Sequence, residues 1–325
     1  MKKIKTVVTE KLGIEYPILQ GCMQWIAKAD LVAAVSEAGG LGIISSSTFA
    51  TAEDLRAEIK KIREKTDKPF AVNITNLPAS FVPDFAGYVR ICVEEGVKII
   101  ETAGLLLAPE LLKQIKDAGI IWIHKCTVIK HALKAQNAGC DMIVADGFEC
   151  AGHPGEDDIG SMVLTPSMIQ ALNIPVITAG GVGTGRQMAA ALMLGAEGVY
   201  MGTRFLLTKE CPVLDNVKQQ IAESASEMDT LLMLRSYRNT TRTYKTEMTK
   251  SVVAREKQGL PFAEVAPDIN GAEVRKMFFE TGDVNNAAYI CVGETVGLIH
   301  DVPTVKEAID GIMAECVACL SKFDA

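Results

Sequence analysis

The sequence lacks the features that mark membrane and nucleic-acid-binding proteins. No apolar run reaches the roughly 18 residues that a bilayer-spanning helix needs, and no apolar signal-peptide core follows Lys2 and Lys3. An excess of basic residues is also missing, because the net charge is -7. We therefore expect a cytoplasmic protein, monomeric or homodimeric, that binds neither membrane nor nucleic acid.

Metal-binding patterns are also missing. The four histidines are dispersed, so no zinc site is expected. The nine cysteines are an odd number spread along the chain, which is typical of reduced thiols in a cytosol. The only C-x-x-C pair is Cys316 and Cys319, and no second pair accompanies it. We expect both thiols to face the core from a C-terminal helix, and we predict no metal.

A dinucleotide-binding G-x-G-x-x-G motif does not follow the first predicted strand, which disfavours an open doubly wound sheet. Instead, short apolar strands alternate with helices eight times, which favours parallel strands in a (β/α)8 TIM barrel. The predicted strands cover residues 16–20, 41–45, 70–73, 98–101, 121–124, 142–145, 175–178 and 198–201.

The alternation ends after Arg204. The segment 209–300 reads as helical, with no convincing strand, and a final amphipathic helix follows over 304–323, where Thr304 and Glu307 have capping-box spacing. A TIM barrel takes roughly 250 residues, and the chain has 325. We expect 1–208 and 301–325 to form the barrel, and 209–300 to form a helical lid and second substrate wall inserted after strand eight.

Glycines end the last two predicted strands, within 175–205. Gly180 and Gly181 follow strand seven, and Gly202 and Thr203 follow strand eight. In this fold the loops after strands seven and eight often bind phosphate, because glycine lets backbone N–H groups approach the oxygens. The alternative is a turn that needs glycine only for tight packing.

Lys125 follows the predicted fifth strand, at the end of the barrel that carries the active site. Its ammonium group could stabilise developing negative charge or form a Schiff base. The alternative is a structural salt bridge, for example with Glu101. His124 is expected to point the opposite way, toward the helix layer.

His153 lies in a glycine-rich acidic loop over 147–156 and could act as a general acid or base near neutral pH. The alternative is a structural pair with Glu156, Asp157 or Asp158. In the segment that follows the barrel strands, basic residues recur at helical spacing and would form one stripe, either solvated or facing an anionic second substrate: Arg235, Arg238, Arg242 and Lys245.

Several motifs together resemble the nitronate monooxygenase family, formerly called 2-nitropropane dioxygenases. They are QGCMQW (20–25), VNIT (72–75), ETAG (101–104), HKCT (124–127), DGFECAGHPGEDD (146–158), TAGGVGTGR (178–186), MGTRF (201–205) and RSYRNTTR (235–242). The resemblance extends to FMN-dependent enoyl-acyl-carrier-protein reductases. It implies an FMN-binding TIM barrel with a helical extension.

The resemblance also implies residue roles. Lys125 is similar to the lysine beside the flavin ring, and His153 to the active-site histidine above it; both are predicted to be catalytic. Met23, Gln24 and Asn73 resemble ring contacts, and the glycines after strands seven and eight resemble the phosphate grip. The full set of predicted cofactor contacts is Gly21, Cys22, Met23, Gln24, Asn73, Lys125, Gly152, Ala179, Gly180, Gly181, Met201, Gly202 and Thr203.

One departure bears on the substrate. Nitronate-oxidising members usually read AGGH before the histidine, whereas this chain has Cys150-Ala-Gly-His153. That form is most similar to the NADH:quinone reductase subgroup. It implies oxidation of NADH or NADPH with electron transfer to a quinone. Nitronate oxidation and enoyl-thioester reduction are the alternatives within the family. From other classes, a flavin-free lyase using Lys125 as a Schiff base, or a non-catalytic phosphate-binding module, stays open.

Overall fold

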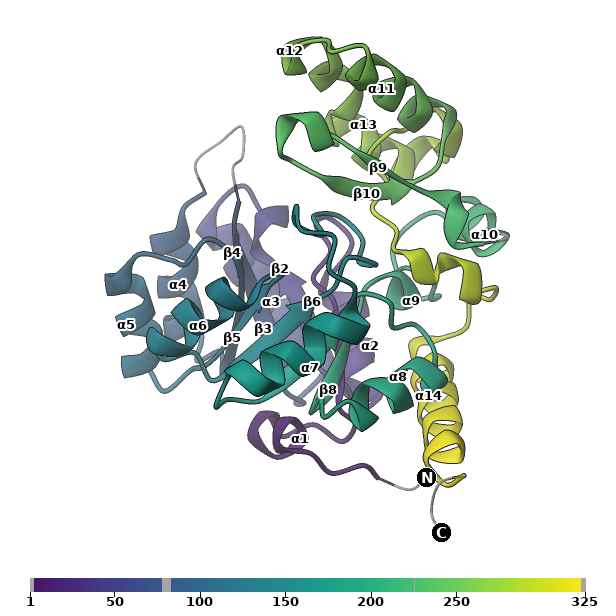
Figure 1. Ribbon diagram of the computed structural model, residues 1–325. Helices are drawn as coiled ribbons and strands as arrows, with labels where there is room; N and C mark the ends of the chain where they lie inside the picture. The colour runs from purple at the N-terminus through teal and green to yellow at the C-terminus, as the bar shows by residue number, and fades with distance from the viewer. Residues whose placement is uncertain (1–2, 78–82, 225, 323–325) are drawn as a thin grey trace.

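The computed structural model describes residues 3–77, 83–224 and 226–322. Eight parallel strands form one sheet in the order β1-β8-β7-β6-β5-β4-β3-β2. A parallel bridge between Leu19 and Leu41 joins the two ends of this order, so the sheet closes into a barrel (Figure 1). The predicted TIM barrel is confirmed. Its strands are β1 (Ile18–Gln20), β2 (Gly42–Ser45), β3 (Phe70–Asn76), β4 (Ile99–Gly104), β5 (Ile121–Cys126), β6 (Met142–Asp146), β7 (Val176–Ala179) and β8 (Gly198–Met201).

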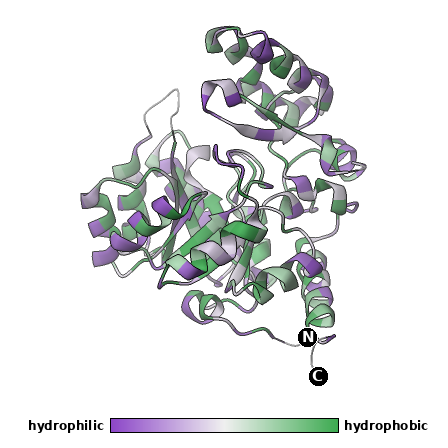
Figure 2. Cartoon of the chain, viewed as in Figure 1, coloured by the Kyte–Doolittle hydropathy of each residue, from purple (hydrophilic) through white to green (hydrophobic). Residues whose placement is uncertain are grey.

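Helices cover the outside of the barrel, and the strands between them are the most hydrophobic part of the chain (Figure 2). The strands are buried on both faces, as expected where helices cover a parallel sheet. A first helix, α1 (Val7–Leu12), was not predicted; Val8 and Leu12 pack with the residues inside the barrel. The outer helices are α2 (Ala29–Glu37), α3 (Ala52–Lys65), α4 (Phe85–Glu94), α5 (Pro109–Asp117), α6 (Ile129–Asn137), α7 (Ser161–Ala171), α8 (Gly185–Met193) and α14 (Val305–Leu320).

Helix starts follow local capping where the sequence supplies it. The predicted capping box at Thr304 and Glu307 begins α14, and Thr51 begins α3 in the same way. Helix α7 begins at Ser161, so that Pro166 lies inside it. There the carboxylate of Glu149, twelve residues earlier, accepts a hydrogen bond from the Ser161 N–H at 2.9 Å.

The segment 209–300 is not all helical, which corrects the prediction. Strands β9 (Thr230–Met233) and β10 (Thr241–Tyr244) pair as an antiparallel hairpin. Three threonines between 240 and 243 favour extended backbone because they are β-branched. Helix α9 (Thr203–Leu206) precedes the segment, which also contains α10 (Asp215–Ala222), α11 (Glu247–Lys257), α12 (Phe262–Val265) and α13 (Gly271–Lys276).

The apolar core continues from the barrel into this segment. Phe205 packs in one buried cluster with Val217, Val274 and Phe278. The last helix, α14, returns to the barrel beside α8 (Figure 1). Cys316 is buried in the same cluster and Cys319 packs against it, so the expected core role of this pair is confirmed. No helix among the described residues has the length and apolarity that crossing a membrane requires.

Candidate functional site

A cavity of about 610 Å³ opens at the carboxyl ends of the barrel strands. Its volume lies within the range of roughly 300–1,000 Å³ typical of cofactor and small-molecule sites. The segment after β8 supplies part of the wall, including Val274, Phe278, Tyr289 and Cys291. All eight barrel strands, or the residues directly after them, contribute the rest, including Gly21, Ser45, Thr75, Ala103, Lys125, Asp146, Gly180 and Gly202.

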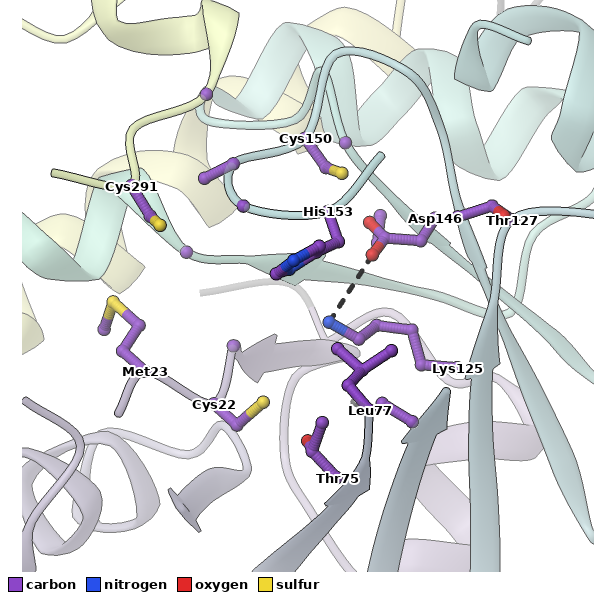
Figure 3. A pocket seen from close by; sticks show the side chains of 18 of the residues that line it. Cys22, Met23, Thr75, Leu77, Lys125, Thr127, Asp146, Cys150, His153 and Cys291 are labelled. Atoms are coloured by element: carbon purple, nitrogen blue, oxygen red, sulfur yellow. Dashed lines mark ion pairs between the residues drawn. The ribbon is translucent and has the colours of Figure 1, made fainter. Parts of the chain in front are cut away.

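Lys125 is held by a carboxylate on the neighbouring strand. It lies near the end of β5, and its Nζ is 3.4 Å from Asp146 Oδ2 on β6. Figure 3 shows this pair, with the lysine extending toward His153. The ammonium also lies 5.3 Å from the centroid of the Tyr200 ring. Asp146, and not the suggested Glu101, is therefore the salt-bridge partner.

The charge of Lys125 is maintained inside the cavity. Burial alone would lower the pKa of Lys125, but the negative charge of Asp146 and other nearby acidic groups outweighs burial and raises it. The ammonium is therefore protonated at neutral pH, which disfavours a Schiff-base role because only the free amine is a nucleophile. Burial also raises the pKa of the Cys22 and Cys291 thiols to about 12, so neither supplies a thiolate.

Glu101 lies behind the cavity, fully buried. Its Oε2 accepts a hydrogen bond from Asn73 Nδ2, and its Oε1 has no partner among the described residues. Burial raises the pKa of Glu101, with the positive charge of Lys125 opposing the shift. The Asn73 side chain therefore donates to the buried Glu101 carboxylate, and Asn73 does not line the cavity.

His153 faces Lys125 across the cavity (Figure 3). Its Nε2 lies 3.1 Å from Asn239 Oδ1, in the loop between β9 and β10. Burial lowers the pKa of His153, although the hydrogen bond to Asn239 opposes this. The ring is therefore neutral at pH 7, with Nε2–H donating to Asn239 and Nδ1 left as an acceptor. None of the three acidic residues suggested earlier is its hydrogen-bond partner.

His124 points into the helix layer, as predicted. It is buried, and its Nδ1 lies 2.8 Å from Thr102 Oγ1. The same hydroxyl group accepts a hydrogen bond from Trp122 Nε1 at 2.7 Å and donates one to Ile123 O at 3.4 Å. His124 is therefore a structural residue.

Glycine shapes the rim after β7 and β8. Gly180 and Gly181 have φ of +75° and +69°, a region that other residues disfavour. A side chain at Gly180 would meet Gly147 O at 2.6 Å, whereas at Gly202 no protein atom lies within 4 Å of the added carbon. In the part of the chain that the structure describes, no backbone hydrogen bond uses the N–H of Gly180, Gly181 or Gly202. These free amides beside open space fit an anion such as a phosphate.

The structure gathers most of the predicted cofactor residues around this cavity. Asn73 and Met201 are the exceptions: both are buried, and neither belongs to its lining. Thr75, two residues beyond Asn73 on β3, borders the cavity in its place. The lining includes Gly21, Cys22, Met23, Gln24, Lys125, Gly152, Ala179, Gly180, Gly181, Gly202 and Thr203.

The basic residues after β8 do not form the expected stripe, because the hairpin replaces the helix that would have aligned them. Arg242 is buried on β10, 2.8 Å from Glu294 Oε1, with its guanidinium over the Phe148 ring. Arg235 is ion-paired with Asp158 at 2.7 Å. Among the four, Arg238 contributes to the cavity wall.

Sequence reasoning assigned no role to several residues of the site. Asp146 is the first residue of the motif DGFECAGHPGEDD and directly follows the sixth predicted strand, and this position could have indicated a place in the site. Tyr200 lies within an apolar strand and carried no signal. Asn239 stands in the quoted motif RSYRNTTR, but its segment was expected to be helical, which gave no reason to place it beside His153. No cluster of histidine, cysteine or acidic residues that could hold a metal ion occurs among the described residues.

Comparison with known proteins identifies the family. The family model described as nitronate monooxygenase matches residues 5–315. The chain belongs to the nitronate monooxygenase family. Among curated members, it is 34% identical to (3aS,4S,5R,7aS)-5-hydroxy-7a-methyl-1-oxo-octahydro-1H-indene-4-carboxyl-CoA dehydrogenase of Rhodococcus jostii, which covers 100% of this chain and 99% of that protein.

Two further relatives differ in how much of the chain they match. A probable nitronate monooxygenase of Staphylococcus haemolyticus is 35% identical, over 69% of this chain and 74% of that protein. FabK of Thermotoga maritima is a structural neighbour with a TM-score of 0.90, 35% identity and 99% coverage of both chains. These relationships make the chain an oxidoreductase-family enzyme with the TIM-barrel fold of its neighbours.

Proposed function

We propose that this family member is an FMN-dependent oxidoreductase that oxidises NADH or NADPH and passes the electrons to a quinone-like acceptor. One observation carries the proposal. A lysine that is protonated at neutral pH and a neutral histidine face each other across a cavity whose rim carries glycine N–H groups without a backbone acceptor among the described residues. The rim suits a phosphate, and the interior suits a redox-active ring.

Gly180, Gly181, Gly202 and Thr203 would hold the FMN phosphate, and Met23, Gln24 and Thr75 would lie along the ring. When bound, FMN supplies the capacity to accept a hydride from a nicotinamide and to release electrons to a second substrate. The residues of the chain contribute binding, orientation and electrostatics.

Lys125 would provide a fixed positive charge where electron density accumulates during turnover, without any change in its own protonation. Asp146 keeps the lysine protonated and oriented. His153 would accept a hydrogen bond or proton at Nδ1, because Nε2 is engaged with Asn239. We further propose that 209–300 acts as a lid over the barrel formed by 1–208 and 301–325, because its residues complete the cavity wall.

The test starts with the absorbance spectrum of the purified protein, followed by anaerobic mixing with NADH and with NADPH. Loss of the flavin absorbance within the turnover time, and its return when a quinone is added, would support the proposal. A colourless folded protein, or a flavin that neither nicotinamide bleaches, would reject it.

A second candidate is oxidation or reduction of a coenzyme A thioester. It is favoured by the Rhodococcus jostii relative, which is named as a carboxyl-CoA dehydrogenase and matches the whole chain, including 209–300. By contrast, the probable nitronate monooxygenase of Staphylococcus haemolyticus matches only 69% of this chain. Enoyl-thioester reduction and nitronate oxidation are variants of the same flavin chemistry. Enoyl thioesters and quinones, which accept electrons, are added to the bleached enzyme. Nitronates and saturated acyl-CoA thioesters, which donate electrons, are added to the oxidised enzyme, and the rates of flavin reoxidation or reduction rank the substrates.

A further inference from the structure

Arg238 has no hydrogen-bonding or ion-pair partner for its side chain among the residues that the structure describes. It lies in the loop between β9 and β10, exposed, and contributes to the wall of the cavity. Among the described residues, no side-chain hydrogen bond or ion pair involves its guanidinium. Its neighbours differ, since Arg235 is paired with Asp158 and Arg242 with Glu294.

The backbone of Arg238 is in an unfavourable conformation. Its φ and ψ are 53° and 40°, in the left-handed region that glycine and asparagine adopt more readily than arginine. The N–H of Arg238 donates a hydrogen bond to Arg235 O, but no hydrogen bond or ion pair of its side chain among the described residues offsets this conformation. Strained residues of this kind concentrate where a ligand binds.

The loop that carries Arg238 is nevertheless fixed at both ends. Glu256 accepts hydrogen bonds from the N–H groups of Leu234 at 2.7 Å and Ser236 at 2.6 Å. On the other side, Glu156 accepts from the N–H of Thr240 at 2.9 Å. The structure therefore fixes the backbone of Arg238 beside the cavity, with the residue in the cavity wall.

Among the described residues, no nearby acidic residue is ion-paired with Arg238. Glu156 is engaged by Thr240 through both its N–H and its hydroxyl group, and Asp158 is paired with Arg235. Asp157 lies between these two residues in the loop from β6 to α7, and it is exposed to solvent. Arg238 thus remains available to an anion from solution.

We propose that Arg238 binds a phosphate group of the second substrate, an adenine nucleotide whose reactive end enters the cavity. A guanidinium forms paired hydrogen bonds with phosphate oxygens. NADH, NADPH and coenzyme A thioesters all carry phosphates some distance from the reacting atoms, whereas simple quinones and nitronates do not. The inference rests on the proposed function, because it requires that such a nucleotide enters this cavity.

The experiment measures binding by calorimetry under anaerobic conditions, with NADH, NADPH and coenzyme A as separate ligands and with the bound flavin kept reduced, so that no hydride transfer accompanies binding. Two variants remove the guanidinium, Arg238→Gln and Arg238→Gly, and the glycine also relieves the backbone conformation. Arg235→Gln is the matched control, because this arginine lies in the same loop but is paired with Asp158 away from the cavity wall.

We expect Kd to rise about tenfold in both Arg238 variants for at least one ligand, with a weaker dependence of Kd on NaCl. Arg235→Gln should stay within about twofold of the parent protein. The Tm of Arg238→Gly should equal or exceed that of the parent, which separates lost binding from lost folding. The ligand with the largest change identifies the nucleotide.

Two results would overturn the inference, and only one of them would also count against the proposed function. Equal Kd values in the parent protein and both Arg238 variants would refute the role of Arg238 while the proposed reductase function stands. Binding of none of the three nucleotides by the parent protein would refute the inference together with the nucleotide half of the proposed function.

Discussion

His153 and Asn239 are 86 residues apart in the sequence, and their side chains lie 3.1 Å apart in the structure. One belongs to the loop after β6 and the other to the hairpin loop of the segment inserted after β8. Because Nε2–H of His153 donates to Asn239 Oδ1, the insert determines which ring nitrogen faces the cavity as an acceptor. The barrel supplies the histidine, and the insert sets its orientation.

The first prediction concerns this contact. Asn239→Ala should lower kcat/KM about tenfold, because the imidazole loses its orientation. The hydrogen bond to Asn239 opposes the effect of burial on the pKa of His153. Its removal should therefore lower that pKa further and move the acid limb of the pH–rate profile to lower pH. An unchanged profile would contradict the assigned role. Asn173→Ala, at an exposed position in the α7–β7 connection, is the control.

The second prediction separates the charge of Lys125 from its structural role. Lys125→Met should lower kcat/KM by about 100-fold, since a fixed charge in the cavity is lost, and should lower Tm because Asp146 is left without its cation. Adding Asp146→Asn should restore part of the Tm but none of the activity. Recovery of activity in the double variant would show that the lysine serves only to neutralise the aspartate.

The third prediction uses two glycines at the cavity rim. At Gly202, φ is -96° and no protein atom lies within 4 Å of an added Cβ, so Gly202→Ala should fold normally. Its affinity for FMN should nevertheless fall about tenfold, because the methyl group occupies space next to the free amide. Fluorescence titration of the FMN-free protein measures this.

Gly180→Ala is the contrasting variant. The positive φ and the 2.6 Å approach to Gly147 O should destabilise the fold itself by about 1–3 kcal/mol. Denaturant unfolding of the FMN-free protein distinguishes the two glycines. If Gly202→Ala bound FMN as tightly as the parent protein, the phosphate site would have to lie elsewhere.

The fourth prediction is a pH dependence of stability from His124. Burial lowers the pKa of His124 from 6.5 to about 4. Between these values the unfolded chain binds more protons than the folded one, so the free energy of unfolding should fall as the pH is lowered from 6.5 toward 4. The expected loss is roughly 3 kcal/mol. Urea unfolding at several pH values measures it.

The matched variant is His124→Asn, whose side-chain amide can replace Nδ1 as the hydrogen-bonding partner of Thr102. It should be less stable than the parent protein at pH 7, because a smaller side chain leaves unfilled space. Its stability should depend less steeply on pH, with the remaining slope in this range coming partly from His153, whose pKa is also lowered by burial. An equally steep slope in the variant would rule out His124 as the source.

The barrel was predictable because its signals are local. Each strand is a short apolar run, and Gly180 and Gly202 mark strand ends within a few residues. The side chains at those ends, such as Lys125, follow from the geometry of parallel strands, which bring their carboxyl ends to one face. The family resemblance added the flavin, which residue patterns alone left open.

The rest depended on contacts between distant parts of the chain. Glu149 begins α7 from twelve residues away, and Asn73 is turned toward the buried Glu101 by a hydrogen bond that spacing does not reveal. The β9–β10 hairpin was missed because charged residues at helical spacing suggested a helix there. No local pattern in the sequence pairs Asn239 with His153.

The backbone bridge between Gly152 and Arg242 has a consequence for how this molecule can change. Its two hydrogen bonds, 3.0 Å and 2.7 Å long, join peptide groups and use no side chain. Mutations in the hairpin loop can therefore alter substrate preference while these backbone hydrogen bonds still join the hairpin to the loop after β6. Such an attachment suits directed evolution, since libraries confined to 234–240 would sample new preferences on a constant frame.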